Sequence, residues 1–283
     1  RLSRPMFLEK GSNHYVPLDW DRAIGIIAKT LNALKDPNDA YFYTSGRASN
    51  EAAYLWQLLA RQYGTNNLPD CSNMCHESSG VALNESIGIG KGTVRLEDFD
   101  KADLIVVVGQ NPGTNHPRML SALKSAKKSG ASILSINPLK ETGMRRFRHP
   151  QSPIDMLGAG TQISDDHVNI KINGDMALFR AIGSIILDKG VHDMDFINLN
   201  TTGFLDYANI ARAVDWGLTE DLTGQSRDRI YEISDYFCRS KRTIVCWAMG
   251  ITQHKNSVNT IREIMNVLPV SYTHLRAHET QPY

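Results

Sequence analysis

The stretch "DLIVVVG", residues 103–109, decides the fold class of this chain. An uninterrupted apolar run between Asp103 and Gly109 is typical of a strand buried on both faces of a parallel sheet. Two further runs have this character, "ASILSIN" at 131–137 and "RTIVCWAMG" at 242–250, and the sequence between them, at 174–240, is mostly helical in pattern. Strands that alternate with helices predict an α/β fold, with a doubly wound parallel sheet and helices on both faces.

The first part of the chain predicts a second lobe. Apolar residues recur at helical spacing after Asp19, a good N-cap, so we expect an amphipathic helix at 20–35. The aromatic run "AYFYT" at 40–44 predicts a short strand, and "SGRASNE" then leads into a helix that should stop at Gly64. We therefore expect residues 1–70 to form the first part of a discontinuous α/β domain and residues 71–268 to form a Rossmann-like α/β domain.

Both ends of the chain are unusual. It opens with "RLSRPMF", without an initiator methionine, so we expect a natural protein to continue upstream. The last stretch, "SYTHLRAHETQPY" at 271–283, has neither helical nor strand periodicity and resembles translated adapter sequence. We expect residues 269–283 to be a non-native tail that packs poorly.

Composition limits the class of partner. The formal net charge is +1 over 283 residues, and its even spread gives no surface suited to nucleic acid or an anionic membrane. No apolar run approaches the roughly 20 residues of a membrane span. The 4 cysteines are too few for a disulfide scaffold, which favours a reducing, cytoplasmic location. The expected partner is a small-molecule substrate.

The segments that follow the predicted strands are polar and rich in small residues: "SGRASNE", "GQNPGTNHP", "NPLKE" and "MGITQH". Ligands of open α/β sheets bind beyond the carboxyl ends of the strands, so this composition suits a polar, phosphate-bearing ligand. The glycine spacing of nicotinamide-binding domains is absent from "GQNPGTNHP". The stretch "SIGIGKGT", at 86–93, does not have the spacing of a nucleotide-triphosphate loop. Glu85, just before it, stands where such a loop needs glycine, and Gly92 stands where it needs serine or threonine.

The segment "CSNMCHESSG", residues 71–80, holds two of the cysteines. These cysteines could form a disulfide, provide two ligands of a zinc site, or include a reactive thiolate. Zinc would need a second suitably spaced pair, which Cys238 and Cys246 do not form. Cys71 fits a small buried side chain. Cys75 precedes a predicted helix at about 76–87, whose N-terminus stabilises a thiolate, so Cys75 is a candidate nucleophile or soft-metal ligand.

Four motifs together resemble the molybdopterin-dependent oxidoreductases, particularly the catalytic subunits of formate dehydrogenases: "GTNNLPDCSNMCHESSG", "VGQNPGTNHPRMLSALKSAKKSGASILSINP", "KINGDMAL" and "WAMGITQHKNSVNTIR". The resemblance spans residues 1 to about 268. It implies a molybdenum or tungsten atom held by two molybdopterin guanine dinucleotides and ligated by Cys75, with His76 as an acid–base residue in the two-electron oxidation of formate or a similar small substrate. It also implies an electron-transfer protein partner, and an iron–sulfur region that would precede Arg1.

The resemblance further assigns cofactor-binding roles in the strand-end loops. The positions are Asn111, Thr114 and Asn115 for pterin and phosphates, Asn137 near the guanosine, Asp175 for guanine or ribose, and Met249, Gly250 and Gln253 against the pterin. Asp175 has a structural alternative, as a cap of the helix that begins near it.

Two departures mark a divergent branch, one that the resemblance links to acid resistance. Glu77 stands beside the metal position within "HESS", and Leu139 stands where an arginine is common. The chain is expected to be an interior fragment that is inactive alone. Two other classes stay open: a non-catalytic dinucleotide-binding domain with a structural or redox-sensing Cys75, and a cysteine hydrolase.

Overall fold

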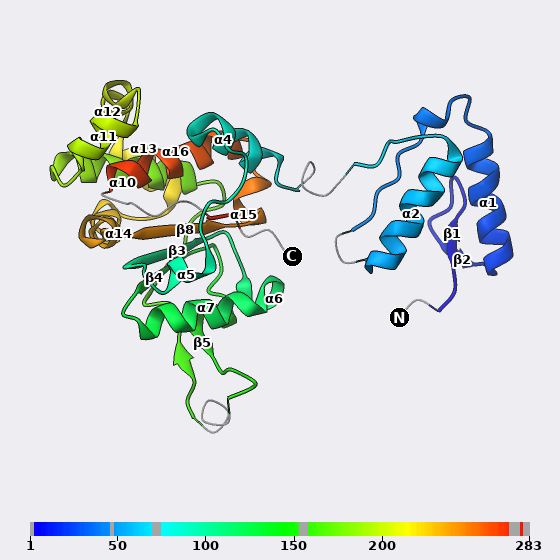
Figure 1. Cartoon of the computed structure of the whole chain (residues 1–283), viewed down its shortest axis with the longest axis horizontal. Coiled ribbons are helices and arrows are strands. Elements are labelled where there is room, and N and C mark those ends of the chain that lie inside the picture. Colours follow the sequence, from blue (N-terminus) through cyan, green and yellow to red (C-terminus); the bar gives the residue numbers. More distant parts are fainter. Residues whose placement is uncertain (1–2, 46–47, 70–74, 153–157, 272–277, 280–283) are drawn as a thin grey trace. The chain divides into compact units, whose positions relative to one another are not determined.

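The computed structural model describes residues 3–45, 48–69, 75–152, 158–271 and 278–279 (Figure 1). The chain divides into two compact units, Arg1–Met74 and Cys75–Tyr283. Of the helices that the structure describes, none combines the length and apolar character needed to cross a membrane.

The first unit is built from two short strands and two long helices. Its elements are β1 (Met6–Leu8), β2 (Tyr15–Pro17), α1 (Trp20–Asn32), a 3₁₀ turn (Pro37–Asp39) and α2 (Asn50–Tyr63). The predicted caps are confirmed, because Asp19 accepts a hydrogen bond from the backbone N–H of Arg22 at 2.7 Å and Gly64 ends α2 in the left-handed conformation.

The predicted strand at 40–44 is wrong. These residues belong to no sheet in the described chain, although Phe42 is buried with Ala40 and Ala60 in a small core. The backbone N–H of Phe42 donates to the carbonyl of Asn67 at 2.9 Å. The aromatic run therefore reflects burial against α2 rather than strand pairing.

The second unit holds a parallel sheet with the strand order β7-β4-β3-β8-β9. The three predicted strands are confirmed as β3 (Leu104–Val108), β4 (Ser132–Ile136) and β8 (Thr243–Trp247). Two strands of this sheet were not predicted: β7 (Asp166–Val168) at one edge and β9 (His278–Glu279) at the other. His278–Glu279 pair with Cys246–Trp247, within the stretch in which the sequence shows no strand periodicity.

Helices cover both faces of this sheet (Figure 1). One face carries α10 (Asp175–Asp188), α11 (Met194–Asn200), α12 (Phe204–Arg212), α13 (Trp216–Thr223), α14 (Arg227–Arg239), α16 (Ser257–Val270) and α4 (Glu77–Ile87), and the other carries α5 (Leu96–Phe99), α6 (Pro112–Asn115), α7 (Pro117–Lys128), α8 (Thr142–Arg145) and the pair β5 (Arg146–Phe147) and β6 (Thr161–Gln162). A short helix, α15 (Met249–Thr252), follows β8.

The burial of β3 explains this two-sided architecture. Leu104, Val106 and Val108 pack in the core shared with α10 and α16, whereas Ile105 and Val107 pack in the core shared with α7. Alternate side chains of a strand point to opposite faces, so an uninterrupted apolar run requires cover on both. The predicted fold class is confirmed.

The ends of three neighbouring strands are joined by backbone contacts. The N–H of Gly109 donates to the carbonyl of Ile136 at 2.9 Å, and the N–H of Gly250 donates to the carbonyl of Gly109 at 3.0 Å. A Cβ atom on Gly250 would lie 2.4 Å from the oxygen of Gly109. Glycine is therefore required at this close approach.

We predict that Gly250→Ala destabilises the second unit by about 1–3 kcal/mol, because the added methyl group must displace backbone rather than a flexible side chain. Urea unfolding monitored by circular dichroism measures the change. Gly217→Ala is the matched control within a helix of the same unit, since its Cβ would meet only Asp215 Oδ1, at 3.5 Å. Equal stability of the Gly250→Ala and wild-type chains would contradict this account of the contact.

Candidate functional site

Cys75 and His76 directly precede α4, as predicted. His76 is the N-cap residue of α4, with φ −126° and ψ 10°, and its side chain makes no capping hydrogen bond. Both residues are partly exposed, and Cys75 is a free thiol. Glu77, the unusual acidic neighbour, is exposed. Cys71 lies outside the described residues, so its predicted burial stays a prediction.

Three hydrogen bonds join Cys75 and the first turn of α4 to β8 and to the segment that follows it. Gln253 Nε2 donates to the carbonyl oxygen of Cys75 at 3.4 Å, and Ser78 Oγ donates to the carbonyl of Thr252 at 3.3 Å. One turn further in, the buried indole Nε1 of Trp247 donates to Ser79 Oγ at 3.0 Å. The fold therefore brings together Cys75 and Gln253, two predicted site residues far apart in sequence.

Farther along α4, Glu85 forms an ion pair with Arg262 of α16. This pair and the contacts with the end of β8 connect α4 to both α15 and α16. The start of α4 is consequently positioned by the same loop that holds the predicted pterin-contact residues.

The loops after β3 and β4 meet at Glu141, a residue that sequence reasoning did not select. Asn111 Nδ2 donates to Glu141 Oε2 at 2.7 Å, and Asn137 Nδ2 lies 3.5 Å from Glu141 Oε1. Asn111 Oδ1 also accepts from the backbone N–H of Thr114 at 3.2 Å and so caps α6. Asn111 and Asn137 thus lie together, and the only sequence signal for Glu141 was its place in the polar segment "NPLKE".

The other predicted positions in these loops are accessible. Thr114, Asn115, Met249, Gly250 and Gln253 are all exposed. Gly113 and Gly143 pack backbone to backbone beside them, since a Cβ on Gly143 would lie 2.7 Å from the Cα of Gly113. The exposed polar positions therefore lie along loops that are themselves packed closely.

Asp175 is the first residue of α10 and is 3% exposed. Gly174 is the N-cap, so the alternative that Asp175 serves as the cap residue is wrong. Burial raises the pKa of Asp175 to about 6, and a hydrogen bond from its own backbone N–H acts in the opposite direction. His254 Nδ1 lies 4.0 Å from the Asp175 carboxylate, and burial lowers the pKa of His254.

Three buried polar atoms follow β8 without a hydrogen-bond partner among the described residues: Thr252 Oγ1, His254 Nδ1 and Asn256 Oδ1. Buried polar atoms in proteins are nearly always hydrogen-bonded, so such a set indicates a place where a polar ligand supplies the partners. The quoted motif "WAMGITQHKNSVNTIR" contained all three residues, but spacing alone does not predict which side chains are buried.

The site therefore has two connected parts. One part is Cys75, which lies beside the loop after β8. The other part is formed by Asn111 and Asn137, in the loops after β3 and β4. The contact between Gly109 and Gly250 joins the loop after β3 to the loop after β8. Within the part of the chain that the structure describes, there is no cluster of three or more histidine, cysteine or acidic side chains placed to hold a metal ion.

Comparison with curated proteins shows relatives along nearly the whole chain. An uncharacterized oxidoreductase of Mycobacterium tuberculosis (strain ATCC 25618 / H37Rv) is 50% identical over 274 residues, which are 95% of this chain and 35% of that protein. Protein YdeP of Escherichia coli (strain K12) is 44% identical over 279 residues, 95% of this chain and 37% of that protein. Formate dehydrogenase H of the same strain is 29% identical over 272 residues, 94% of this chain and 36% of that protein. The chain thus spans little more than a third of the length of these relatives.

Among solved structures, acetylene hydratase from Pelobacter acetylenicus matches with a TM-score of 0.64 and 18% sequence identity, over 92% of this chain and 34% of that chain. This match supports the fold. The model of the molybdopterin oxidoreductase family matches residues 1–276, so the resemblance inferred from the four motifs is confirmed. The chain belongs to the molybdopterin oxidoreductase family.

Proposed function

We propose that the chain is part of the catalytic subunit of a molybdenum or tungsten enzyme that oxidises formate or a similar small substrate. The observation that carries the proposal is the position of Cys75 and His76 at the start of α4, where Gln253 from the loop after β8 contacts the Cys75 backbone. Family membership implies a molybdopterin cofactor with molybdenum or tungsten. The guanine dinucleotide form of the cofactor, an iron–sulfur cluster upstream and an electron-transfer partner belong to the same proposal.

The residues present fit such a cofactor. The buried atoms of Thr252, His254 and Asn256 that have no hydrogen bond among the described residues offer polar contacts to a ligand rich in hydrogen-bonding groups. The backbone approach of Gly109 to Gly250 leaves no side chain where these two loops meet. Exposed Met249 and Gln253 would contact the pterin, and the loops that carry Asn111, Thr114, Asn115 and Asn137 would contact the phosphates and guanosine, with Asp175 at the guanine or ribose.

Cys75 would supply a thiolate ligand to the metal. A thiolate sulfur is a soft donor that suits a heavy redox metal, and Cys75 directly precedes the N-cap residue of α4. The bound metal–pterin group supplies the capacity to take up two electrons from the substrate. His76, directly beside the thiolate, would accept the proton that formate releases, because imidazoles exchange protons near neutral pH.

We predict that Cys75→Ser in a full-length protein containing this chain nearly abolishes turnover and loosens the metal, because a serine hydroxyl is harder and far less acidic than a thiol. His76→Ala should leave the metal in place and lower the rate by about 10²- to 10⁴-fold, the usual contribution of a general acid–base residue. Metal analysis by mass spectrometry and an assay of formate oxidation measure the two effects.

Cys71→Ser is the matched control, with near-normal metal content and rate expected. Loss of metal in Cys71→Ser together with an active Cys75→Ser would show that the two cysteines have been exchanged in this assignment. Wild-type full-length protein that binds a nucleotide but neither molybdenum nor tungsten would instead favour the non-catalytic dinucleotide-binding domain.

Asp175 allows a separate test in the 283-residue chain. Its pKa in the folded protein, about 6, is above its ordinary value of 3.8, so the folded state favours the protonated acid. The buried carboxylate therefore lowers stability above pH 6, and this effect diminishes as the pH falls through 6 and is gone below about 4. A ligand that hydrogen-bonds the carboxylate would offset this cost.

We predict that Asp175→Asn raises the free energy of unfolding by up to about 3 kcal/mol at pH 7.5, because the neutral amide removes a buried charge. The difference from wild type should shrink at pH 4.5. Urea unfolding of both chains at the two pH values measures it. A variant that is less stable than wild type at pH 7.5 would show that the carboxylate is satisfied within the protein.

A further inference from the structure

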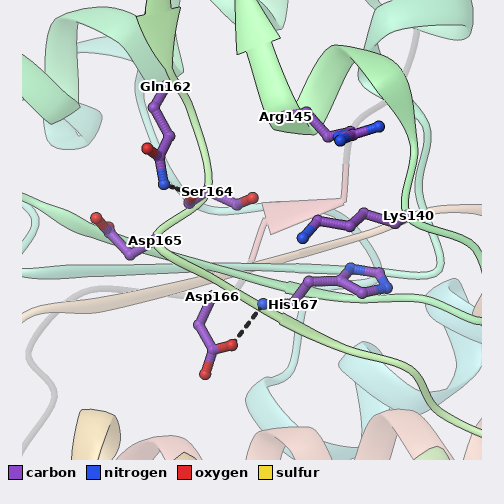
Figure 2. A pocket seen from close by; sticks show the side chains of 7 residues that line it. All are labelled: Lys140, Arg145, Gln162, Ser164, Asp165, Asp166 and His167. Carbon is purple, nitrogen blue, oxygen red and sulfur yellow. Dashed lines mark hydrogen bonds between the residues drawn. The ribbon is translucent and has the colours of Figure 1, made fainter.

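A cavity of about 280 Å³ lies at the β7 edge of the sheet, beside the loop that carries Asn137 (Figure 2). Its lining comes from the loop after β4, from α8, from β6, from β7 and from the segment between these two strands: Lys140, Arg145, Gln162, Ser164, Asp165, Asp166 and His167. None of the predicted site residues lines it.

The acidic side chains of this cavity are already engaged. Asp166 accepts two hydrogen bonds from Arg229 of α14, at 2.6 and 2.7 Å. Asp165 forms an ion pair with Lys127 and accepts from the backbone N–H of Ile133 at 2.8 Å. Their negative charges are therefore compensated within the protein.

The neutral polar groups are also bonded within the protein. Ser164 Oγ donates to the carbonyl of Met144 at 2.9 Å, and Gln162 Nε2 donates to the carbonyl of Ser164 at 3.0 Å. These contacts fix the segment between β6 and β7 that forms one wall of the cavity. The groups that stay available to a ligand belong to the opposite side.

The basic side chains are not engaged. Neither Lys140 nor Arg145 has an ion pair or side-chain hydrogen bond within the described ranges, and both are exposed at the cavity. Both ring nitrogens of His167 are buried and also lack a hydrogen-bond partner there. Figure 2 shows Lys140 beside the His167 ring, with Arg145 on the same side of the cavity.

Strand geometry explains why His167 faces the cavity. Successive side chains of a strand point to opposite faces. Asp166 points to α14 on one face, so His167 points to the other, where α7 and α8 lie. Burial, and next the charge of Lys140, lower the pKa of His167, whereas Asp166 and Glu141 act in the opposite direction. A negatively charged ligand would offset the effect of the lysine.

We propose that this cavity binds a small oxyanion, a phosphate or carboxylate group, through Lys140, Arg145 and His167. Among the described residues the two cations of this cavity have no ion pair, the His167 ring can donate one N–H, and the carboxylates are already paired, so the uncompensated charge of the cavity is positive. A water molecule occupies about 30 Å³ in the liquid. The cavity therefore has room for the oxyanion and part of the molecule that carries it.

The test is a titration of the 283-residue chain with inorganic phosphate, followed by the ¹⁵N signals of the histidine rings. His167→Gln identifies the His167 signals among the 9 histidines of the chain. We expect a saturable shift of the His167 signals. Lys140→Met combined with Arg145→Met should weaken binding by about tenfold or more, because two charge-assisted hydrogen bonds are removed.

Lys91→Met combined with Lys101→Met is the matched control, since it removes the same charge from exposed positions of the same unit. This control should change the dissociation constant by no more than about twofold, because exposed distant charges are screened by salt. A parallel titration with acetate distinguishes a phosphate site from a carboxylate site. If neither anion shifts the His167 signals saturably, or if both double variants weaken binding equally, the proposal is wrong.

Discussion

The contact between the glycine backbones at the ends of β3 and β8 is the constraint on which the site depends. Gly109 and Gly250 approach so closely that neither can carry a side chain, and each also takes part in a backbone hydrogen bond between strand ends. Parallel strands in register place their carboxyl ends at one edge of the sheet. The glycine contact then places the loop after β8 directly on the loop after β3, so residues from different crossovers form one surface.

The start of α4 depends on this arrangement. Gln253 and Thr252 belong to the loop that the glycine contact positions. Thr252 accepts a hydrogen bond from Ser78 of α4, and Gln253 donates one to the carbonyl of Cys75, which precedes the helix. The helix also packs against α10 and α16 in the apolar core on one face of the sheet. Apolar packing therefore determines the position of α4, whereas the hydrogen bonds of Cys75 and Ser78 determine the position of the residues at its N-terminal end.

The sequence predicted those features that depend on local pattern. The strands around Leu104, Ile133 and Val245 were recognisable because each is an apolar run, and α1 and α2 were recognisable from their caps and spacing. The strand β7 was missed because it has three residues, two of them polar. Residues 40–44 were wrongly predicted as a strand because an aromatic run is equally compatible with burial against a helix.

The site was predicted only as separate segments. Its motifs identified Cys75 and the strand-end loops, but the link through Glu141 and the proximity of Asp175 to His254 join residues that are far apart in the chain. No periodicity encodes such distances, because they follow from how the loops pack after the sheet has formed. The cavity beside β7 was missed for the same reason.

The hydrogen bond between Trp247 and Ser79 has a consequence for tryptophan fluorescence. Trp247 is one of 4 tryptophans in the chain, is fully buried, and donates its indole N–H to Ser79 in the helix that Cys75 precedes. Indole emission is sensitive to the polarity and hydrogen bonding around the ring. The Trp247 contribution to the emission therefore depends on the contact between β8 and α4, which is made at Ser79, one helical turn after the residue proposed to bind the metal.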